Sequence, residues 1–165
     1  MEKIMESVTE KSILTSNELL EIWQGNRRLT RRTIEAFPED KLFTFSVGGM
    51  RPFAQLVLEM AGMAIPGMDG IVSSKWGNYD DVQKNAPTTK EGLLALWDET
   101  TEKINRLWPQ IKPERFREVE AAFGIYENTI FATITYFIEN EIHHRAQGYV
   151  YLRALGIEPP HFWER

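Results

Sequence analysis

The 165-residue sequence contains no cysteine. This absence excludes a disulfide framework, a zinc site built from cysteine and a cysteine nucleophile. The N-terminal stretch is charged and has no apolar core of the kind that signal peptides carry. Taken together, these two absences lead us to expect a cytoplasmic protein.

Long hydrophobic runs are also missing. The run from Ile130 to Ile138 is among the longest, and it is too short and too rich in threonine to span a bilayer, so we expect no contact with a membrane. The net charge of −5 disfavours nucleic acid as a partner, because phosphate backbones require clustered basic residues. The one tight basic run, residues 27–32, is interpreted as a solvated helical face.

The residues that are present have the balance of an ordinary globular protein. Hydrophobic residues make up 42% of the chain and charged residues 26%. A chain of this length fits one domain, which we place at residues 1–165. Its nine Phe, five Trp and five Tyr residues suit a core or a pocket built from large side chains.

Apolar periodicity and stop signals predict four substantial helices and no convincing strand. After a lead-in at residues 1–15, we expect helices at 16–37, 50–64, 88–108 and 126–155. Residues 42–49 are read as a connector, 113–122 as one or two helical turns, and 158–165 as a tail that packs back on the helices. The stretch 65–87 is predicted to be a loop in which Trp76 and Tyr79 could lie over a pocket. The fold class that follows is all-α, a four-helix bundle.

The last predicted helix has a stripe that is apolar at both ends and polar in the middle. Asn140, Glu141 and His144 occupy the positions where a plain core helix would carry leucine or alanine. Burying these groups costs free energy unless they are paired, hydrogen-bonded or bound to a metal. The stripe therefore indicates either a polar network or a binding site.

A metal site is one interpretation of this pattern. Asn140 and His144 are four residues apart, so their side chains meet on adjacent turns, and Glu59 would supply a third ligand if the second helix faces the last. Three protein ligands with open positions describe a catalytic metal site. The alternative is a hydrogen-bond network without metal, which is the commoner use of such residues. His143 points about 100° away from His144, and His161 lies in the tail.

Two stretches resemble a known family. HHRAQGYVYLRALGIEPP, from His143 to Pro160, is similar to the C-terminal signature of the DinB-like (damage-inducible, YfiT-related) family, and SVGGMRPFAQLVLEM, from Ser46 to Met60, resembles its second-helix motif. The resemblance implies a helical bundle, commonly dimeric, with three histidines around a divalent ion such as nickel or zinc. Some members of this family are thiol-dependent transferases and others are hydrolase-like.

The ligand positions depart from the family pattern. His144 matches the last metal histidine, but Asn140 and Glu59 stand where the other two are expected, and Ala146 replaces a glycine. A site of one nitrogen and two oxygen ligands is harder, and would favour manganese or iron over zinc or nickel.

Two functions follow as hypotheses. In the first, the protein is a metal-dependent hydrolase or thiol transferase acting on a small-molecule substrate, with Glu59, Asn140 and His144 as ligands and Glu141 or His143 as a nearby base. In the second, it is a non-catalytic homodimer that has lost its metal and binds a small molecule or acts in a stress response. We expect a homodimer in both cases.

Overall fold

The computed structural model describes residues 13–165, so most of the predicted lead-in lies outside the described residues. Within them, the long helices are α1 (Ser16–Ala36), α3 (Phe53–Ser73), α5 (Lys90–Leu107) and α6 (Ile130–Ala154). The shorter elements are α2 (Glu39–Thr44), α4 (Asp81–Lys84), the 3₁₀ turns η1 (Trp108–Gln110) and η2 (Pro113–Arg117), and the strands β1 (Val119–Ala122) and β2 (Tyr126–Thr129).

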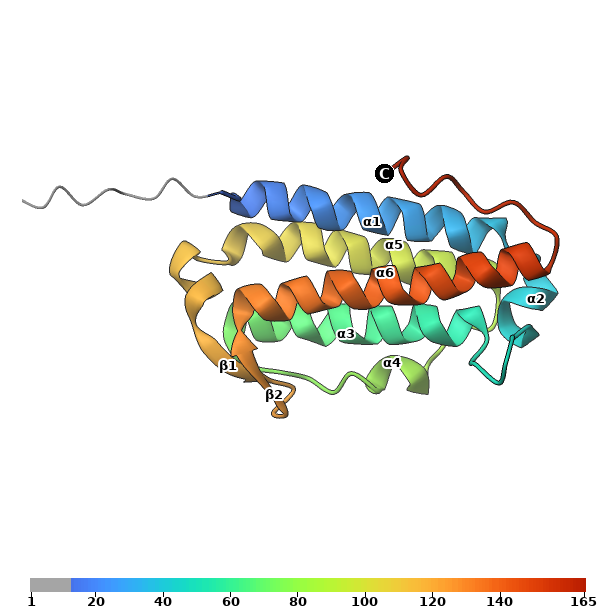
Figure 1. Ribbon diagram of the computed structural model, residues 1–165. Coiled ribbons are helices and arrows are strands. Elements are labelled where there is room, and N and C mark those ends of the chain that lie inside the picture. Colours follow the sequence, from blue (N-terminus) through green and yellow to red (C-terminus); the bar gives the residue numbers. More distant parts are fainter. Residues whose placement is uncertain (1–12) are drawn as a thin grey trace, which may run out of the picture.

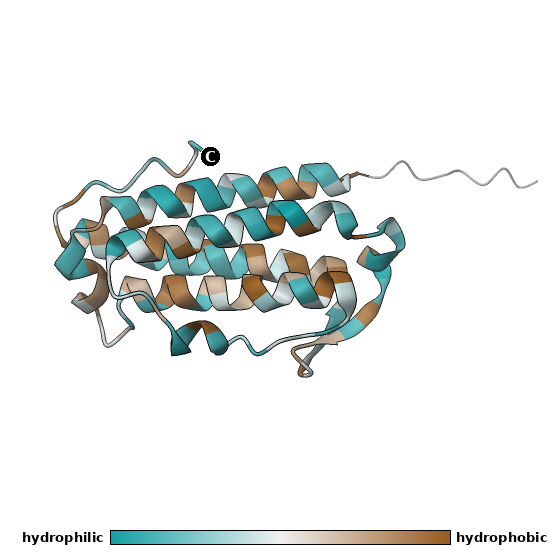
Figure 2. Cartoon of the chain, turned by 180° about the vertical axis from the view of Figure 1, so that it is seen from behind, coloured by the Kyte–Doolittle hydropathy of each residue, from teal (hydrophilic) through white to brown (hydrophobic). Residues whose placement is uncertain are grey.

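The four long helices lie side by side, and α6 packs against both α3 and α1 (Figure 1). Figure 2 shows α3 mostly in brown and pale colours, whereas α1 and α5 also carry many hydrophilic residues. The C-terminal tail returns along α1, where Glu164 pairs with Arg32 at 3.4 Å. The predicted path of the tail is therefore confirmed, although Phe162 and Trp163 remain 60% and 65% exposed.

Threonine side chains begin three of the long helices. Thr15 and Glu18 form a capping box at α1, and the hydroxyls of Thr89 and Thr129 accept hydrogen bonds from the backbone N–H groups of Gly92 and Ala132. Each of these contacts satisfies an amide that has no partner inside its helix. Thr89 is therefore the cap of α5, and the helix begins at Lys90, two residues after the predicted start.

Helix α3 is longer than predicted. It continues through Pro66 to Ser73, whereas the sequence pattern placed a loop from residue 65 onward. The glycines that suggested a loop serve close packing, because a Cβ at Gly67 would lie 2.5 Å from the Phe137 ring and one at Gly70 would lie 2.3 Å from the Trp76 ring. Packing against neighbouring elements has outweighed local helix propensity here.

Helix α3 is apolar enough to be compared with a membrane-spanning helix. Its length and hydropathy would allow it to cross a bilayer, yet 67% of its most apolar window is buried inside the protein. Ile71, Val57 and Met68 are fully enclosed by neighbouring helices. This is the burial expected of a core helix.

A β-hairpin was missed by the sequence analysis. Strands β1 and β2 pair antiparallel, with Ala122 opposite Tyr126, so α6 begins at Ile130 and not at Tyr126. The turn between them places Phe123 and Gly124 at φ values of 54° and 74°. A left-handed conformation costs a non-glycine residue about 1–2 kcal/mol. The all-α prediction thus holds in its coarser form, since the chain is mostly helical with one small sheet.

The short segments around these helices differ in detail from the prediction. Residues 39–44 form α2, which includes the first residues of the connector expected at 42–49, and the chain then continues through Gly48 and Gly49 to Arg51. Residues 113–117 form the predicted helical turn, but 119–122 belong to the hairpin.

The close approach of α6 to α3 gives a test of this packing. A Cβ at Gly148 would lie 2.4 Å from Cε2 of Phe53, whose side chain is fully buried. We therefore expect Gly148→Ala to lower the free energy of unfolding by about 1–3 kcal/mol, even though alanine favours helix. Urea denaturation measures this effect.

The double variant Gly148→Ala/Phe53→Leu is the control. If the two residues clash as described, the smaller Leu side chain makes room for the new methyl group, and the combined loss is smaller than the sum of the single losses. Strict additivity of the two variants would contradict the proposed contact.

Candidate functional site

The predicted ligand residues come together between α3 and α6. His144 Nε2 lies 2.9 Å from Glu59 Oε1, and Asn140 Nδ2 lies 3.4 Å from the same oxygen. His144 is 6% exposed, and Glu59 keeps 29% of its side chain accessible. Three residues chosen from spacing alone thus converge on one carboxylate oxygen, which confirms their proximity. Their roles as ligands stay a prediction.

The orientation of the His144 ring is set by Gln147. The ring's Nδ1 lies 2.8 Å from Gln147 Oε1, and Gln147 Nε2 faces Met50 Sδ at 3.6 Å. With the amide oxygen of Gln147 toward the ring, Nδ1 carries a hydrogen and donates it; with the amide turned over, Nδ1 accepts from the amide nitrogen instead. Gln147 was part of the polar stripe in the sequence, but its link to His144 required the structure.

The tautomer with hydrogen on Nδ1 leaves Nε2 facing the Glu59 carboxylate. A neutral imidazole with hydrogen on Nδ1 presents a lone pair at Nε2, and a carboxylate oxygen also only accepts. Two acceptors 2.9 Å apart repel unless a positive charge lies between them, either a proton or a metal ion. Either a hydrogen on Nε2, which makes the contact a hydrogen bond to Glu59, or a metal ion bound by both atoms satisfies this pair.

Arg51 supplies positive charge to the other side of Glu59. Its Nη2 lies 2.5 Å from Glu59 Oε2, and the hydroxyl of Tyr151 donates to the Arg51 carbonyl at 2.9 Å. Burial on its own would raise the pKa of Glu59, but hydrogen bonds from His144 and Arg51 outweigh it and hold that pKa below its ordinary value. No pattern in the sequence singled out Arg51.

Asn140 has an unsatisfied oxygen at this site. Its Oδ1 is buried and has no hydrogen-bond partner among residues 13–165. Native proteins rarely leave such an atom unpaired. Rotating the amide by 180° would exchange Oδ1 and Nδ2, and would turn the oxygen toward the same point as Nε2 of His144 and Oε1 of Glu59.

The other histidines lie apart from this centre. His143 is exposed, and its ring centroid is 5.0 Å from that of His144. His161 stacks on Trp163 in the tail at 4.6 Å. Among the described residues, no group of three or more His, Cys, Asp or Glu side chains is arranged to hold a metal ion.

Glu141 points toward α1 and not toward α3. Its Oε1 accepts a hydrogen bond from Thr30 at 2.8 Å, and its carboxylate lies 3.7 Å from Arg27 and 3.9 Å from Arg145. All three charged side chains are at least 94% buried. The structure therefore places Glu141 in a separate buried charge cluster, not beside Glu59 and His144.

Arg27 corrects the prediction of a solvated basic face. It is 1% exposed, donates to Thr101 at 2.7 Å and to the carbonyl of Trp97 at 2.8 Å, and lies 3.6 Å over the Trp97 ring. Burial lowers its pKa to about 10, against the opposing effect of Glu141, so Arg27 stays protonated at neutral pH. Burial likewise raises the pKa of Glu141, although Arg27, Thr30 and Arg145 lower it.

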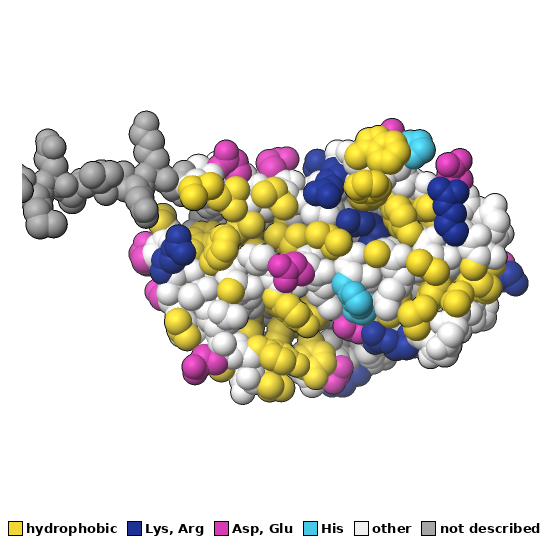
Figure 3. All heavy atoms as spheres, in the orientation of Figure 1, with side chains coloured by type: hydrophobic (Ala, Val, Ile, Leu, Met, Phe, Trp, Pro, Cys, Tyr) yellow, Lys and Arg dark blue, Asp and Glu magenta, His cyan; other side chains and the backbone are white. Residues whose placement is uncertain are grey.

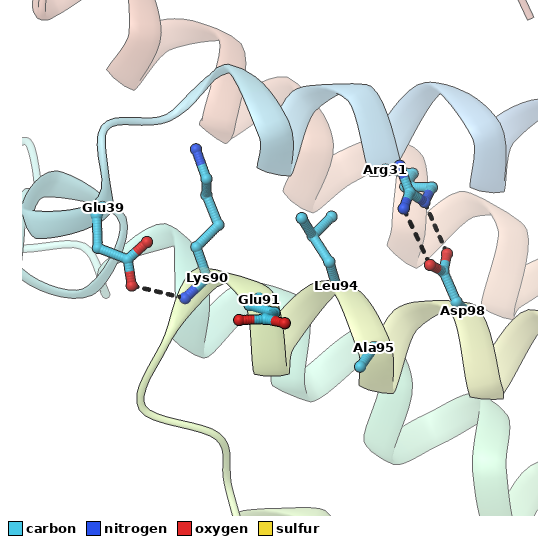
Figure 4. Close-up of a pocket in the computed structure, with 7 residues that line it drawn as sticks. All are labelled: Arg31, Glu39, Lys90, Glu91, Leu94, Ala95 and Asp98. Carbon is cyan, nitrogen blue, oxygen red and sulfur yellow. Dashed lines mark hydrogen bonds and ion pairs between the residues drawn. The ribbon is translucent and has the colours of Figure 1, made fainter.

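A second groove lies between α1 and α5, and its polar side chains are already paired with one another (Figure 4). Arg31 spans it with two hydrogen bonds to Asp98, at 2.7 and 3.0 Å, and Glu39 accepts a hydrogen bond from the backbone N–H of Lys90 at 2.9 Å. Because these groups satisfy one another, we assign no site here.

The fold and this polar centre define a mostly helical protein with its polar site between two long helices. Comparison with protein families matches residues 7–165 to the DinB family, and the chain belongs to that family. The resemblance read from the sequence is confirmed.

Two solved structures are similar in fold. A DinB-like protein, YjoA, from Bacillus subtilis superposes with a TM-score of 0.70 at 22% identity, covering 90% of this chain and 100% of that one. A DinB-like protein from Bacillus cereus gives a TM-score of 0.68 at 17% identity, covering 88% of this chain and 95% of that one. Among curated proteins, none matches this sequence.

The buried charge cluster leads to a prediction about stability. Glu141→Ala would leave Arg27 and Arg145 without their carboxylate, and removing one partner of a buried ion pair typically costs about 3–5 kcal/mol. We expect a loss of that size in the free energy of unfolding, measured by chemical denaturation.

Glu139→Ala is the matched control, since Glu139 is exposed on the same helix. It should change stability by less than about 0.5 kcal/mol. A loss below about 1 kcal/mol for Glu141→Ala would contradict the structural role of the cluster.

Proposed function

We propose that the protein holds a divalent metal ion with Glu59, Asn140 and His144 and uses it in a hydrolysis or thiol-transfer reaction on a small molecule. The proposal includes a single domain, a four-helix bundle of the DinB type. One observation supports it above all others: His144 Nε2 and Glu59 Oε1 lie 2.9 Å apart between α3 and α6, close enough to bind one ion together.

The residues present fit such an ion. Nitrogen and oxygen ligands lie about 2.0–2.2 Å from a divalent ion, so two ligands at right angles are about 3 Å apart, which matches the separation of these two atoms. Asn140 would bind the ion through Oδ1 once its amide is turned over, in place of the present 3.4 Å contact of Nδ2 with Glu59. Gln147, which accepts the Nδ1 hydrogen of His144, is the kind of outer contact that fixes a ligating imidazole.

Each side chain has a distinct role in this proposal. When bound, the ion would acidify a water or thiol ligand and polarise a substrate oxygen. Gln147 holds the His144 ring in one tautomer, and Arg51 balances the second oxygen of Glu59. His143, exposed beside His144, is placed to exchange a proton with solvent. Glu141 is assigned to the buried charge cluster and not to proton transfer.

The donor set also indicates the type of ion. One imidazole nitrogen, a carboxylate oxygen and an amide oxygen form a harder site than three histidines do. Manganese or iron is therefore favoured over nickel or zinc. A homodimer remains part of the proposal, supported by exposed apolar residues on the outer face of α6, namely Tyr136, Ile142 and Val150.

A second candidate function is supported by Arg51. Its guanidinium is 2.5 Å from Glu59, and a proton shared between His144 and Glu59 would satisfy the remaining acceptors without metal. In that case the chain is a non-catalytic protein that binds a small molecule at a polar network.

Metal content separates the two candidates. We expect protein purified without a metal-affinity tag, and reconstituted with manganese, iron, nickel or zinc, to hold about one ion per chain by elemental analysis. His144→Ala and Glu59→Gln should lower that occupancy about tenfold or more, because each removes a ligand.

His143→Ala serves as the control and should retain the ion, since this histidine lies outside the centre. The metal proposal fails if the unaltered protein binds none of the four ions after reconstitution.

Arg51 gives an independent prediction. Since its charge competes with the ion for Glu59, Arg51→Ala should raise metal affinity about two- to fivefold, the equivalent of a partly exposed ion pair. Calorimetric titration with manganese measures this change. Arg153→Ala is the control, because Arg153 is an exposed arginine whose nearest acid is Glu158 at 3.8 Å. Weaker binding by Arg51→Ala would show that Arg51 supports the ion instead of opposing it.

A further inference from the structure

A pocket lies next to the polar centre along the same pair of helices. It has a volume of about 430 Å³ and is bounded by α3, α6 and the β-hairpin. Its walls include Met63, Phe123, Tyr126, Tyr136 and Phe137. Figure 3 shows hydrophobic side chains gathered round a hollow below α6, beside the hairpin. Such a volume accommodates a small ring system.

The pocket is lined by residues one helical turn from the proposed site. Met63 follows Glu59 by one turn of α3, and Phe137 precedes Asn140 by about one turn of α6. Neighbouring turns of a helix are about 5–6 Å apart. One small molecule could therefore place a ring in the pocket and a polar group at Glu59 and His144.

The hairpin places the aromatic ring of Phe123 in the pocket wall, and the backbone of Phe123 is strained there. Phe123 occupies a left-handed turn position that Asn, Asp or Gly normally fills. Its ring lies against those of Trp76, Tyr79 and Phe137, with centroids 5.4, 5.6 and 6.2 Å apart. Trp76 and Tyr79 thus support the pocket wall from behind and do not cover its mouth. A turn alone does not require a phenylalanine in this strained conformation. The three ring contacts that hold Phe123 there therefore favour a functional use of its ring.

The pocket also contains a threonine hydroxyl on a largely buried residue. Thr133 lines the pocket and is 6% exposed, and its hydroxyl makes no hydrogen bond to another group within residues 13–165. Other buried threonines, such as Thr30 and Thr33, use their hydroxyls in hydrogen bonds. The one charged residue in the described lining, Glu127, is exposed at the rim and disfavours anions.

We propose that this pocket is a binding subsite for an uncharged aromatic ring with a hydroxyl or N–H substituent that hydrogen-bonds to Thr133. The proposal rests on the proposed function for the polar end of the ligand, but the ring site itself does not depend on metal. It names the substrate class as a small phenol-like or indole-like molecule.

The test compares p-cresol with toluene, which lacks the hydroxyl. We expect p-cresol to bind saturably by ligand-observed NMR titration, and Thr133→Val to weaken its binding about fivefold, the usual worth of one hydrogen bond. Toluene should bind Thr133→Val and the unaltered protein equally. Tyr136→Ala should weaken both probes about three- to tenfold, because it removes a ring contact.

Phe162→Ala is the matched control for loss of an exposed aromatic residue, and should leave both affinities unchanged. Tyr136 is 52% exposed, so its truncation leaves the fold intact, which circular dichroism checks. The proposal is overturned if p-cresol does not bind up to its solubility limit, or if Tyr136→Ala and Thr133→Val bind it like the unaltered protein.

Measuring metal content on the same samples separates this proposal from the previous one. Saturable p-cresol binding in protein that takes up no metal supports the ring site and defeats the metal centre. Metal uptake in protein that does not bind p-cresol supports the metal centre and defeats the ring site.

Discussion

The buried charge cluster of Arg27, Glu141 and Arg145 is the interaction on which the rest of the structure depends. It joins α6 to α1 directly, and Arg27 extends it to α5 through Thr101 and the Trp97 carbonyl. Charges buried to this degree are tolerated only when their hydrogen bonds are satisfied. Thr30 and Asn26 complete those bonds, so the cluster fixes both the rotation and the axial position of α6.

That rotation is what brings the functional residues to α3. Consecutive helical residues point about 100° apart, so once Glu141 and Arg145 face α1, Asn140 and His144 must face another neighbour. The neighbour is α3, which carries Glu59, and Arg51 in the connector just before α3 completes the polar centre. The glycine contact at Phe53 then brings the two helices close together one turn further on. A structural cluster on one side of α6 thus positions a candidate site on the other.

Much of this arrangement could be predicted from local pattern. The 3.6-residue period placed Asn140 and His144 on adjacent turns, and their burial cost pointed to a partner such as Glu59. Features that depend on distant neighbours could not be read in this way. Pro66 and Gly67 signalled a loop because the packing of Gly67 against Phe137, which keeps this stretch helical, is not encoded locally. Arg27 looked like a surface residue because its partners are 70 or more positions away. The hairpin was missed because the ring contacts that hold Phe123 come from other elements.

The presence of Arg51 at the site is related to the presence of Glu59. A histidine at position 59, as the family resemblance implies for relatives, would add no charge and would need no arginine beside it. Glu59 adds a negative charge in a half-buried position, and Arg51 balances one of its oxygens while the other faces His144. Asn140 keeps an oxygen where a third histidine would have offered nitrogen. In the proposed metal site, Glu59 and Asn140 would therefore offer oxygen atoms where the family resemblance implies histidine nitrogens, and the 2.9 Å between Glu59 Oε1 and His144 Nε2 would allow both atoms to bind one ion.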